Sequence, residues 1–151
     1  MIRAYEPSDT EDIVDVWYKA SSLAHPFLSD EFQEKEKDNI RKIYLPNTET
    51  WVYEDGDRLV GFISMIGTQI GAIFLDPSFH RRGIGKAMLD WVVQKHGDVE
   101  VEVFKENEIG RSFYKKMGFR FQREYIHEPT SQIVYCLQLS GNKDSANENV
   151  P

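Results

Sequence analysis

A basic, glycine-rich loop is the stretch of this sequence whose residue types most clearly indicate chemistry. It reads HRRGIG at residues 80–85, and Lys86 opens the helix expected after it. The first N–H groups of a helix have no partner within it, and the helix dipole places partial positive charge there. Glycines expose these N–H groups, and basic side chains add formal charge. The loop therefore predicts a site for a phosphate or pyrophosphate.

Neither of two common nucleotide-binding motifs fits this loop. The P-loop pattern GxxxxGK[ST] fails because His80 stands five residues before Gly85 and Ala87 replaces the hydroxyl residue that would hold magnesium. The dinucleotide pattern GxGxxG fails because Met88 replaces its third glycine. No acidic residue ends a second parallel strand, so a ribose contact of the Rossmann type is not supplied.

A short apolar strand and a tight turn lead into the loop. Residues 70–75 are all apolar or glycine, which is typical of a buried strand, and Asp76-Pro77 follows as a turn. The helix after the loop is expected to run to about Lys95. Residues 99–104 alternate apolar and polar side chains and predict a strand parallel to the first, by the right-handed crossover rule.

The rest of the chain predicts further elements on both sides of this unit. Strands are expected at residues 2–5, 51–54, 58–66, 119–126 and 132–139, and helices at 8–24, 29–44 and 108–117. Ser8 and Glu11 predict a capping box for the first helix, with Leu23 on its buried face. Tyr44 is expected to pack inward from the second helix, and Cys136 to be a small buried residue.

Length, charge and cysteine content narrow the classes of function. A chain of 151 residues is expected to form one domain with a single core. The net charge of −7 and the pI near 5.1 argue against nucleic acid as the main partner and mildly favour a cationic acceptor. The single cysteine and the scattered histidines predict neither a disulfide nor a metal site. With no signal peptide and no apolar run of ~20 residues, we expect a soluble cytoplasmic protein that does not bind membranes.

Two blocks of the sequence together resemble the GNAT acetyltransferase superfamily. Residues 73–89 are similar to its [QR]-x-x-G-x-[GA] loop, which follows a strand and a D-P turn, with His80 where Gln or Arg is usual. Residues 101–119 are similar to its V-x-x-x-N-x-x-A-x-x-F-Y-x-x-x-G-F block, with Gly110 in place of Ala. Two blocks in this order and at this separation are far more specific than either alone.

The resemblance covers residues 1–139 and is greatest to small stand-alone bacterial members of uncertain substrate. It implies an α/β fold with a mixed, mostly antiparallel sheet of about seven strands, flanked by about four helices, and a splayed central pair of parallel strands. Residues 1–139 would form the acetyltransferase domain, and the polar residues 140–151 would form a disordered tail.

The resemblance also implies acetyl-CoA as the acyl-donor cosubstrate and a primary amine that attacks the thioester directly. Tyr114 stands at the usual general-acid position, where a phenol with a pKa of ~10 can protonate the leaving thiolate. Asn107 is expected to cap its helix and is a candidate to bind the pantetheine arm. The cofactor-binding residues implied are Ile73, Phe74, Leu75, Arg81, Arg82, Gly83, Ile84, Gly85, Lys86 and Asn107. The first three would act through their backbone, which would pair with pantetheine and polarise the thioester carbonyl.

The general base is open at this point. An alkylammonium ion has a pKa of ~10.4 and must lose a proton before it can attack. The candidates are Glu102, Glu106, Glu54, His25, His127 and a water molecule. Residues 25–28 and 126–131 are in segments that wall the acceptor site in the superfamily.

The acceptor and one broad alternative are also open. Protein lysines, protein N-termini and small-molecule amines all fit, because fold does not settle substrate. A CoA-binding regulatory module without turnover, or a protein-interaction module on the same fold, would share these motifs. The presence of both Tyr114 and Asn107 favours an enzyme. Homodimers are common in the superfamily, although no stretch of this sequence indicates an interface.

Overall fold

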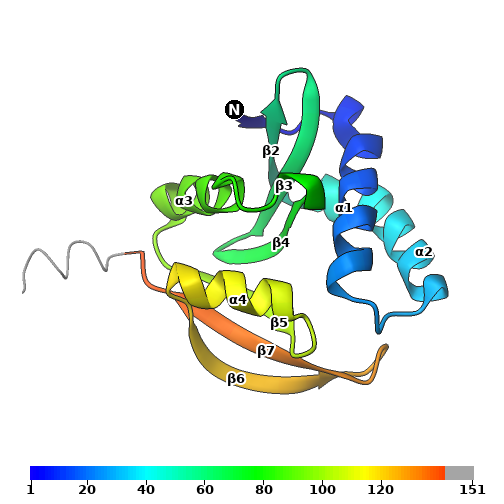
Figure 1. Ribbon diagram of the computed structural model, residues 1–151, viewed down its shortest axis with the longest axis vertical. Coiled ribbons are helices and arrows are strands. Elements are labelled where there is room, and N and C mark those ends of the chain that lie inside the picture. Colours follow the sequence, from blue (N-terminus) through cyan, green and yellow to red (C-terminus); the bar gives the residue numbers. More distant parts are fainter. Residues whose placement is uncertain (142–151) are drawn as a thin grey trace, which may run out of the picture.

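A seven-stranded mixed sheet runs through the molecule in the order β1-β2-β3-β4-β5-β7-β6 (Figure 1). The computed structural model describes residues 1–141. The strands are β1 (Ile2–Ala4), β2 (Glu49–Asp55), β3 (Arg58–Ile66), β4 (Gln69–Leu75), β5 (Val99–Phe104), β6 (Arg120–His127) and β7 (Gln132–Leu139). The central β4–β5 pair is parallel, and every other neighbouring pair in the described chain is antiparallel. This arrangement confirms the expected fold class.

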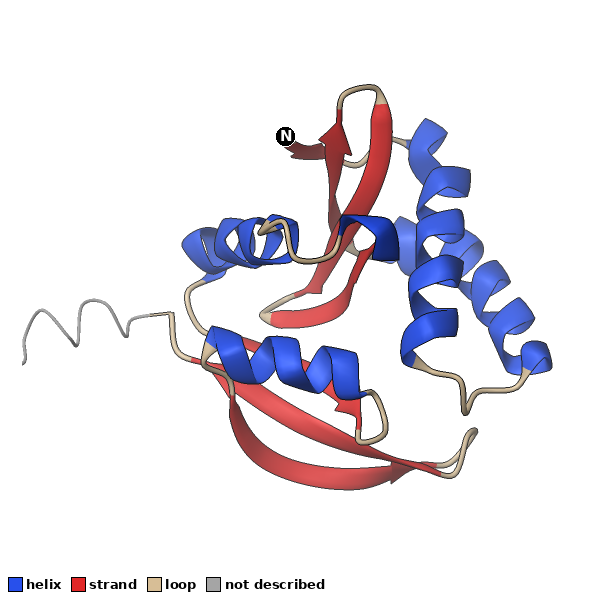
Figure 2. Cartoon of the chain, in the orientation of Figure 1, coloured by secondary structure: helices blue, strands red, loops and turns tan. Residues whose placement is uncertain are grey.

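The parallel pair at the centre of the sheet is incomplete. Strands β4 and β5 pair only at Gln69–Glu100 and Ile70–Val101. On their outer sides both strands stay paired to their ends, β4 with β3 and β5 with β7. The two halves of the sheet consequently turn away from each other beyond Ile70, as Figure 2 shows.

Within residues 1–141 there are four α-helices: α1 (Thr10–Ala24), α2 (Asp30–Asn39), α3 (Ile84–His96) and α4 (Glu108–Met117). Successive residues of a strand point to opposite faces, so the central strands supply two cores. Trp51 and Ile63 pack in a core that includes residues of α3 and α4. Val52 and Phe62, their neighbours in sequence, pack in a second core with α1. Helices α3 and α4 therefore lie on the face of the sheet opposite to α1.

Two helix ends differ from the sequence predictions. The Ser8–Glu11 capping box does not form, because Pro7–Asp9 make a 3₁₀ turn and α1 begins only at Thr10. The helix expected over 29–44 is α-helical to Asn39 and then continues as a π-helical turn, Ile40–Tyr44. The wider turn changes which side chains face inward.

Three burial predictions also need correction. Leu23 is 51% exposed, because the buried stripe of α1 continues from Trp17 to Ser21, one turn later, and leaves Leu23 at its margin. Tyr44 is 42% exposed, since the π-helical turn buries its first residue, Ile40, and not its last. Cys136 is only partly buried, because it lies on the sheet face that α3 and α4 do not cover. The predicted tail lies outside the described residues from residue 142 onward.

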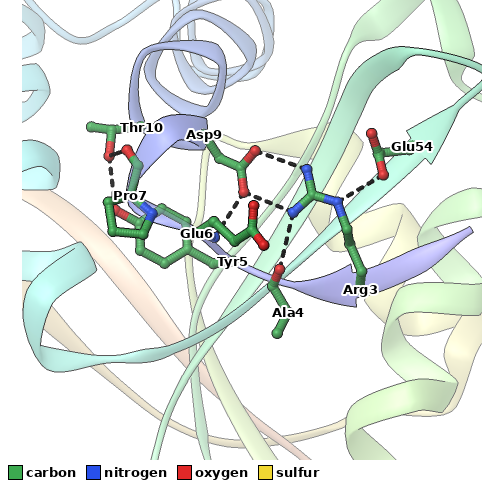
Figure 3. A network of polar contacts seen from close by, with 8 residues as sticks. All are labelled: Arg3, Ala4, Tyr5, Glu6, Pro7, Asp9, Thr10 and Glu54. Carbon is green, nitrogen blue, oxygen red and sulfur yellow. Dashed lines mark hydrogen bonds and ion pairs between the residues drawn. The ribbon is translucent and has the colours of Figure 1, made fainter.

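Arg3 ties the N-terminal edge strand to the rest of the fold (Figure 3). Its guanidinium donates two hydrogen bonds to the Asp9 carboxylate, at 2.8 and 2.9 Å, and one to Glu54 at 2.7 Å. The Asp9 carboxylate also accepts from the N–H of Glu6. Asp9 is buried, and the hydrogen bonds from Arg3 hold its pKa below the usual value despite that burial. One side chain thus joins β1, β2 and the turn that starts α1.

We expect Asp9→Asn to lower the free energy of unfolding by about 1–3 kcal/mol at neutral pH, because Arg3 loses the charge of Asp9 and keeps only that of Glu54. A carboxylate whose pKa is depressed by folding stabilises the protein above the unfolded pKa of ~3.9, and this stabilisation is lost as the pH falls through the folded pKa. Urea unfolding at pH 7 and pH 3 should therefore show a smaller difference between variant and wild type at pH 3.

The matched control is Asp55→Asn, at the exposed last residue of β2. It should change the free energy of unfolding by less than about 0.5 kcal/mol at either pH. An equal loss in both variants, or a loss in Asp9→Asn that does not depend on pH, would contradict this account of the network.

Candidate active site

The loop before α3 presents the open N-terminus of that helix. Gly83 is the N-cap residue and has a φ of 80°, which glycine adopts without strain. No side chain caps α3, and its first turn carries no acidic residue. By contrast, Ser29 and Asn107 cap α2 and α4 with their side chains. The free N–H groups and the dipole of α3 are therefore available to an anion.

The basic side chains of the loop differ in whether they form an ion pair with an acidic residue. Arg81 and Arg82 are exposed, and neither takes part in an ion pair within residues 1–141. The Lys86 ammonium lies 2.7 Å from the Asp90 carboxylate, which offsets part of its charge. Arg81 also adopts a left-handed φ of 67°, unusual for a side chain of its size. The two arginines are thus the stronger candidates for contact with a phosphate.

The apolar positions of the loop fix its path. Ile84 is buried in the core beneath α3, so only its backbone faces a ligand. Gly85 lies against α4, where an added Cβ would come within 3.1 Å of the Phe113 ring. A glycine at this position lets α3 and α4 approach closely.

Asp76 holds the turn that leads into this loop. Its Oδ1 accepts hydrogen bonds from the N–H of Ser78 at 3.0 Å and from the Ser78 hydroxyl at 2.7 Å. Its Oδ2 accepts from Arg58, also at 2.7 Å. Burial opposes the ionisation of Asp76, but the bonds from Ser78 and the charge of Arg58 outweigh it and lower the pKa. Arg58 was missed in the sequence, because nothing in its local pattern indicates a partner 18 residues away.

A hollow of about 200 Å³ opens where β4 and β5 diverge. It is lined by Gln69, Ile70, Gly71, Glu102, Val103, Phe104, Tyr125, His127 and Val134. Ile73, Phe74 and Leu75 continue β4 past the last pair with β5, so their backbone on that side has no strand partner. Such a strand edge can pair with an extended ligand.

Tyr114 lies on α4 and packs in the core between Phe113 and Phe119, with ring centroids 5.5 and 5.2 Å away. Burial raises its pKa well above the usual value. Within residues 1–141 its hydroxyl has no hydrogen-bond partner. Tyr114 therefore keeps its proton at neutral pH and can donate it to a ligand.

Asn107 and His25 form a buried polar pair at the start of α4. The side-chain oxygen of Asn107 accepts from the N–H of Gly110 at 2.8 Å, which is the predicted cap. Its amide nitrogen lies 3.1 Å from Nε2 of His25. Nδ1 of His25 lies 2.9 Å from the hydroxyl of Ser21. Burial lowers the pKa of His25 to about 4, so the ring is neutral at neutral pH. The contacts with Ser21 and Asn107 occupy both of its nitrogens.

The candidate bases differ in whether they line the hollow between β4 and β5. Glu102 lines the hollow, where its carboxylate accepts a 2.7 Å hydrogen bond from the hydroxyl of Tyr125. Burial, together with that bond, raises the pKa of Tyr125 to about 12. His127 also lines the hollow, with Nδ1 held 2.8 Å from the hydroxyl of Thr130. Glu54 pairs with Arg3 and, like the exposed Glu106, is not among the lining residues.

A second hollow, of about 300 Å³, is lined by four aspartates but only two basic residues, Lys19 and Arg58. The excess of negative charge makes it a poor site for a phosphate. From residue 1 to 141 there is no group of three or more His, Cys, Asp or Glu side chains placed to hold a metal ion. In the same part of the chain, no helix has both the length and the apolar character needed to span a membrane.

Comparison with known sequences gives consistent matches. The acetyltransferase (GNAT) domain family matches residues 46–121. The chain is 34% identical over 120 residues to the peptidyl-lysine N-acetyltransferase YiaC of Escherichia coli K12, covering 79% of this chain and 82% of that protein. It is 30% identical over 120 residues to the peptidyl-lysine N-acetyltransferase YjaB of the same organism, covering 79% and 81%.

Solved structures share the whole fold. The solution structure of apo YjaB from E. coli superposes with a TM-score of 0.83 and 26% identity, covering 91% of this chain and 95% of that chain. The PaiA N-acetyltransferase of Thermoplasma acidophilum, solved in complex with coenzyme A, superposes with a TM-score of 0.68, covering 90% and 96%. At 20% identity the second likeness speaks to the fold alone.

We expect Gly83→Glu to abolish measurable acetyl-CoA binding in calorimetry, because it strains a left-handed position and places a negative charge at the helix N-terminus. Gly83→Ala is the matched control, since an added Cβ at this position meets nothing within 4 Å and adds no charge. It should bind acetyl-CoA more weakly than wild type but measurably. Wild-type affinity in Gly83→Glu would show that the pyrophosphate does not bind at this loop.

Proposed function

The chain belongs to the acetyltransferase (GNAT) family, and from this premise we propose that it acetylates lysine side chains of proteins. It is an acyltransferase that moves the acetyl group of acetyl-CoA to a primary amine. The lysine acceptor and the roles of individual residues as acid, base and oxyanion donor are part of this proposal. They are supported by the names of the two relatives and by the geometry around the gap between β4 and β5.

The observation that carries the proposal is that candidate acid and base lie on opposite faces of the divergent strands. Tyr114 packs with Val101 and Val103, whose side chains point to the face covered by α3 and α4. Glu102, between these two valines, points to the other face and lines the hollow. Acetyl-CoA would lie along the first face, with its pyrophosphate at α3. The amine would enter through the hollow, and the two would meet at the gap.

The chemistry then follows from these positions. Glu102, directly or through water, takes a proton from the ammonium group, and the free amine attacks the thioester carbon. A backbone N–H of residues 73–75 donates to the developing oxyanion. The new C–N bond forms, the C–S bond breaks, and Tyr114 protonates the departing sulfur. Because its pKa is raised by burial, Tyr114 is protonated before each turnover.

A lysine side chain suits the hollow for two reasons. Its aliphatic stem can pack against the ring of Phe104, and its charged end can approach the Glu102 carboxylate. The net charge of −7 also favours a cationic partner. The domain boundary at residue 139, the homodimer and the cytoplasmic location expected from the sequence stay predictions.

We expect the enzyme to acetylate a peptide whose N-terminus is blocked and whose one reactive amine is a lysine. The same peptide with arginine in place of lysine and a free N-terminus should give at least tenfold less thiol release. Equal rates on both peptides would overturn the lysine assignment while leaving the acetyltransferase activity in place.

Tyr114→Phe and Glu102→Gln should each lower kcat by about 10²-fold or more, the usual effect of losing an acid or base. Acetyl-CoA affinity should stay within about twofold of wild type in both, because neither group is needed to bind the pyrophosphate. Steady-state kinetics and calorimetry measure the two quantities.

Two conservative changes serve as controls. Glu100→Gln alters the same face of β5 two residues before Glu102, and Tyr18→Phe alters an exposed tyrosine of α1. Both controls should retain wild-type kcat. Full activity in Tyr114→Phe or Glu102→Gln would remove that residue from the mechanism.

A further inference from the structure

His25 sits where the two central strands separate. Its ring makes edge-to-face contacts with Phe74 of β4 and Phe104 of β5, at centroid distances of 6.5 and 5.2 Å. Those strands have no backbone pairing beyond Ile70 and Val101. His25 is buried although it lies in the connection between α1 and α2, far from β5 in sequence. Its ring therefore lies between the rings of Phe74 and Phe104, one from each of the divergent strands.

The hydrogen bonds around His25 define its tautomer. The side-chain oxygen of Asn107 is committed to the N–H of Gly110, so its amide nitrogen faces His25. An amide nitrogen can only donate, and Nε2 must consequently be the acceptor. The proton of the neutral ring then lies on Nδ1 and is donated to the hydroxyl of Ser21. The N–H of Gly110 can only donate, so this bond excludes a flip of the Asn107 amide.

Gly110 is matched to this arrangement. A Cβ at this position would lie 2.6 Å from the amide nitrogen of Asn107 and 3.1 Å from Cγ2 of Val103. The first of these distances is too short for a stable contact, so an alanine would push the Asn107 amide away from His25. Glycine inside a helix is unfavourable compared with alanine, and its presence here therefore has a packing reason.

We propose that His25 is a positioning residue for acetyl transfer: its neutral imidazole packs between the rings of Phe74 and Phe104 and orients the Asn107 amide, whose second N–H is then presented to the pantetheine arm. This inference rests on the proposed function and adds to it the contact between Asn107 and the pantetheine arm that the family resemblance implies. One side chain then links the segment beside the acceptor hollow to the helix that carries Tyr114.

The tautomer can be tested in the wild-type protein without any ligand. A long-range ¹H–¹⁵N spectrum distinguishes the protonated from the unprotonated ring nitrogen of each histidine. We expect His25 to carry its proton on Nδ1 between pH 6 and pH 8. A proton on Nε2, or a ring that is doubly protonated in this range, would overturn the proposal.

A double-mutant cycle tests the coupling. His25→Phe keeps a ring between Phe74 and Phe104 but removes both hydrogen bonds. Asn107→Ser keeps a side-chain cap for α4 but removes the amide. Each single variant should raise the KM and the dissociation constant for acetyl-CoA about tenfold, with kcat changed by less than threefold. The double variant should be no weaker than Asn107→Ser alone, and losses that multiply would overturn the proposal.

Gly110→Ala gives an independent test that does not depend on the folding of His25→Phe. Alanine has the higher helix propensity, but its Cβ must displace the buried Asn107 amide, so the two effects oppose each other and the melting temperature should stay close to that of wild type. Acetyl-CoA binding should nevertheless weaken as in His25→Phe, because the amide is displaced. His25→Gln, which can place an oxygen acceptor near the position of Nε2, should recover most of the affinity. Wild-type binding by Gly110→Ala would contradict the proposal.

The outcomes separate this inference from the function on which it rests. If Asn107 does not contact the cofactor, Asn107→Ser will bind acetyl-CoA like wild type, and the positioning role fails while acetylation of the lysine peptide persists. If only the positioning role is wrong, Asn107→Ser will weaken binding while His25→Phe and Gly110→Ala will not.

Discussion

The incomplete pairing of β4 and β5 is the constraint on which the rest of the site depends. Two paired positions join the halves of the sheet, and beyond them the strands separate. Unpaired backbone is costly when it is buried, so a gap of this kind must be filled by side chains or by a ligand. Aromatic rings, His25 among them, fill part of it, and the remaining edge of β4 is left for an extended cosubstrate.

The alternation of side chains along β5 places different groups on the two faces of the sheet beside the gap. Because side chains alternate along β5, Glu102 and its valine neighbours point in opposite directions. In the proposed mechanism, the proton acceptor and the proton donor therefore approach one reaction centre from two sides without meeting each other. If both groups lay on one face, their mutual contact would compete with the substrates.

Charge is arranged locally on an acidic molecule. The uncapped N-terminus of α3 and two arginines without ion pairs in the described chain make a small positive region at the glycine loop. Asp76, although acidic, helps to build this region, because its carboxylate accepts hydrogen bonds from Arg58 and Ser78. The net charge of −7 therefore does not oppose the binding of a phosphate at this position.

The sequence by itself determined the features that depend on neighbours along the chain. These include the glycine loop, the Asn107 cap, the strand–helix–strand unit and the order of elements, since helix and strand periodicities are local properties. The tertiary structure alone decided which of the candidate carboxylates reached the hollow, and it put Glu54 with Arg3 instead. It also decided that His25, one of the candidate bases, has both nitrogens engaged. These outcomes depend on contacts between residues up to 82 positions apart. Such contacts are selected by packing and chain closure, and no local pattern records them.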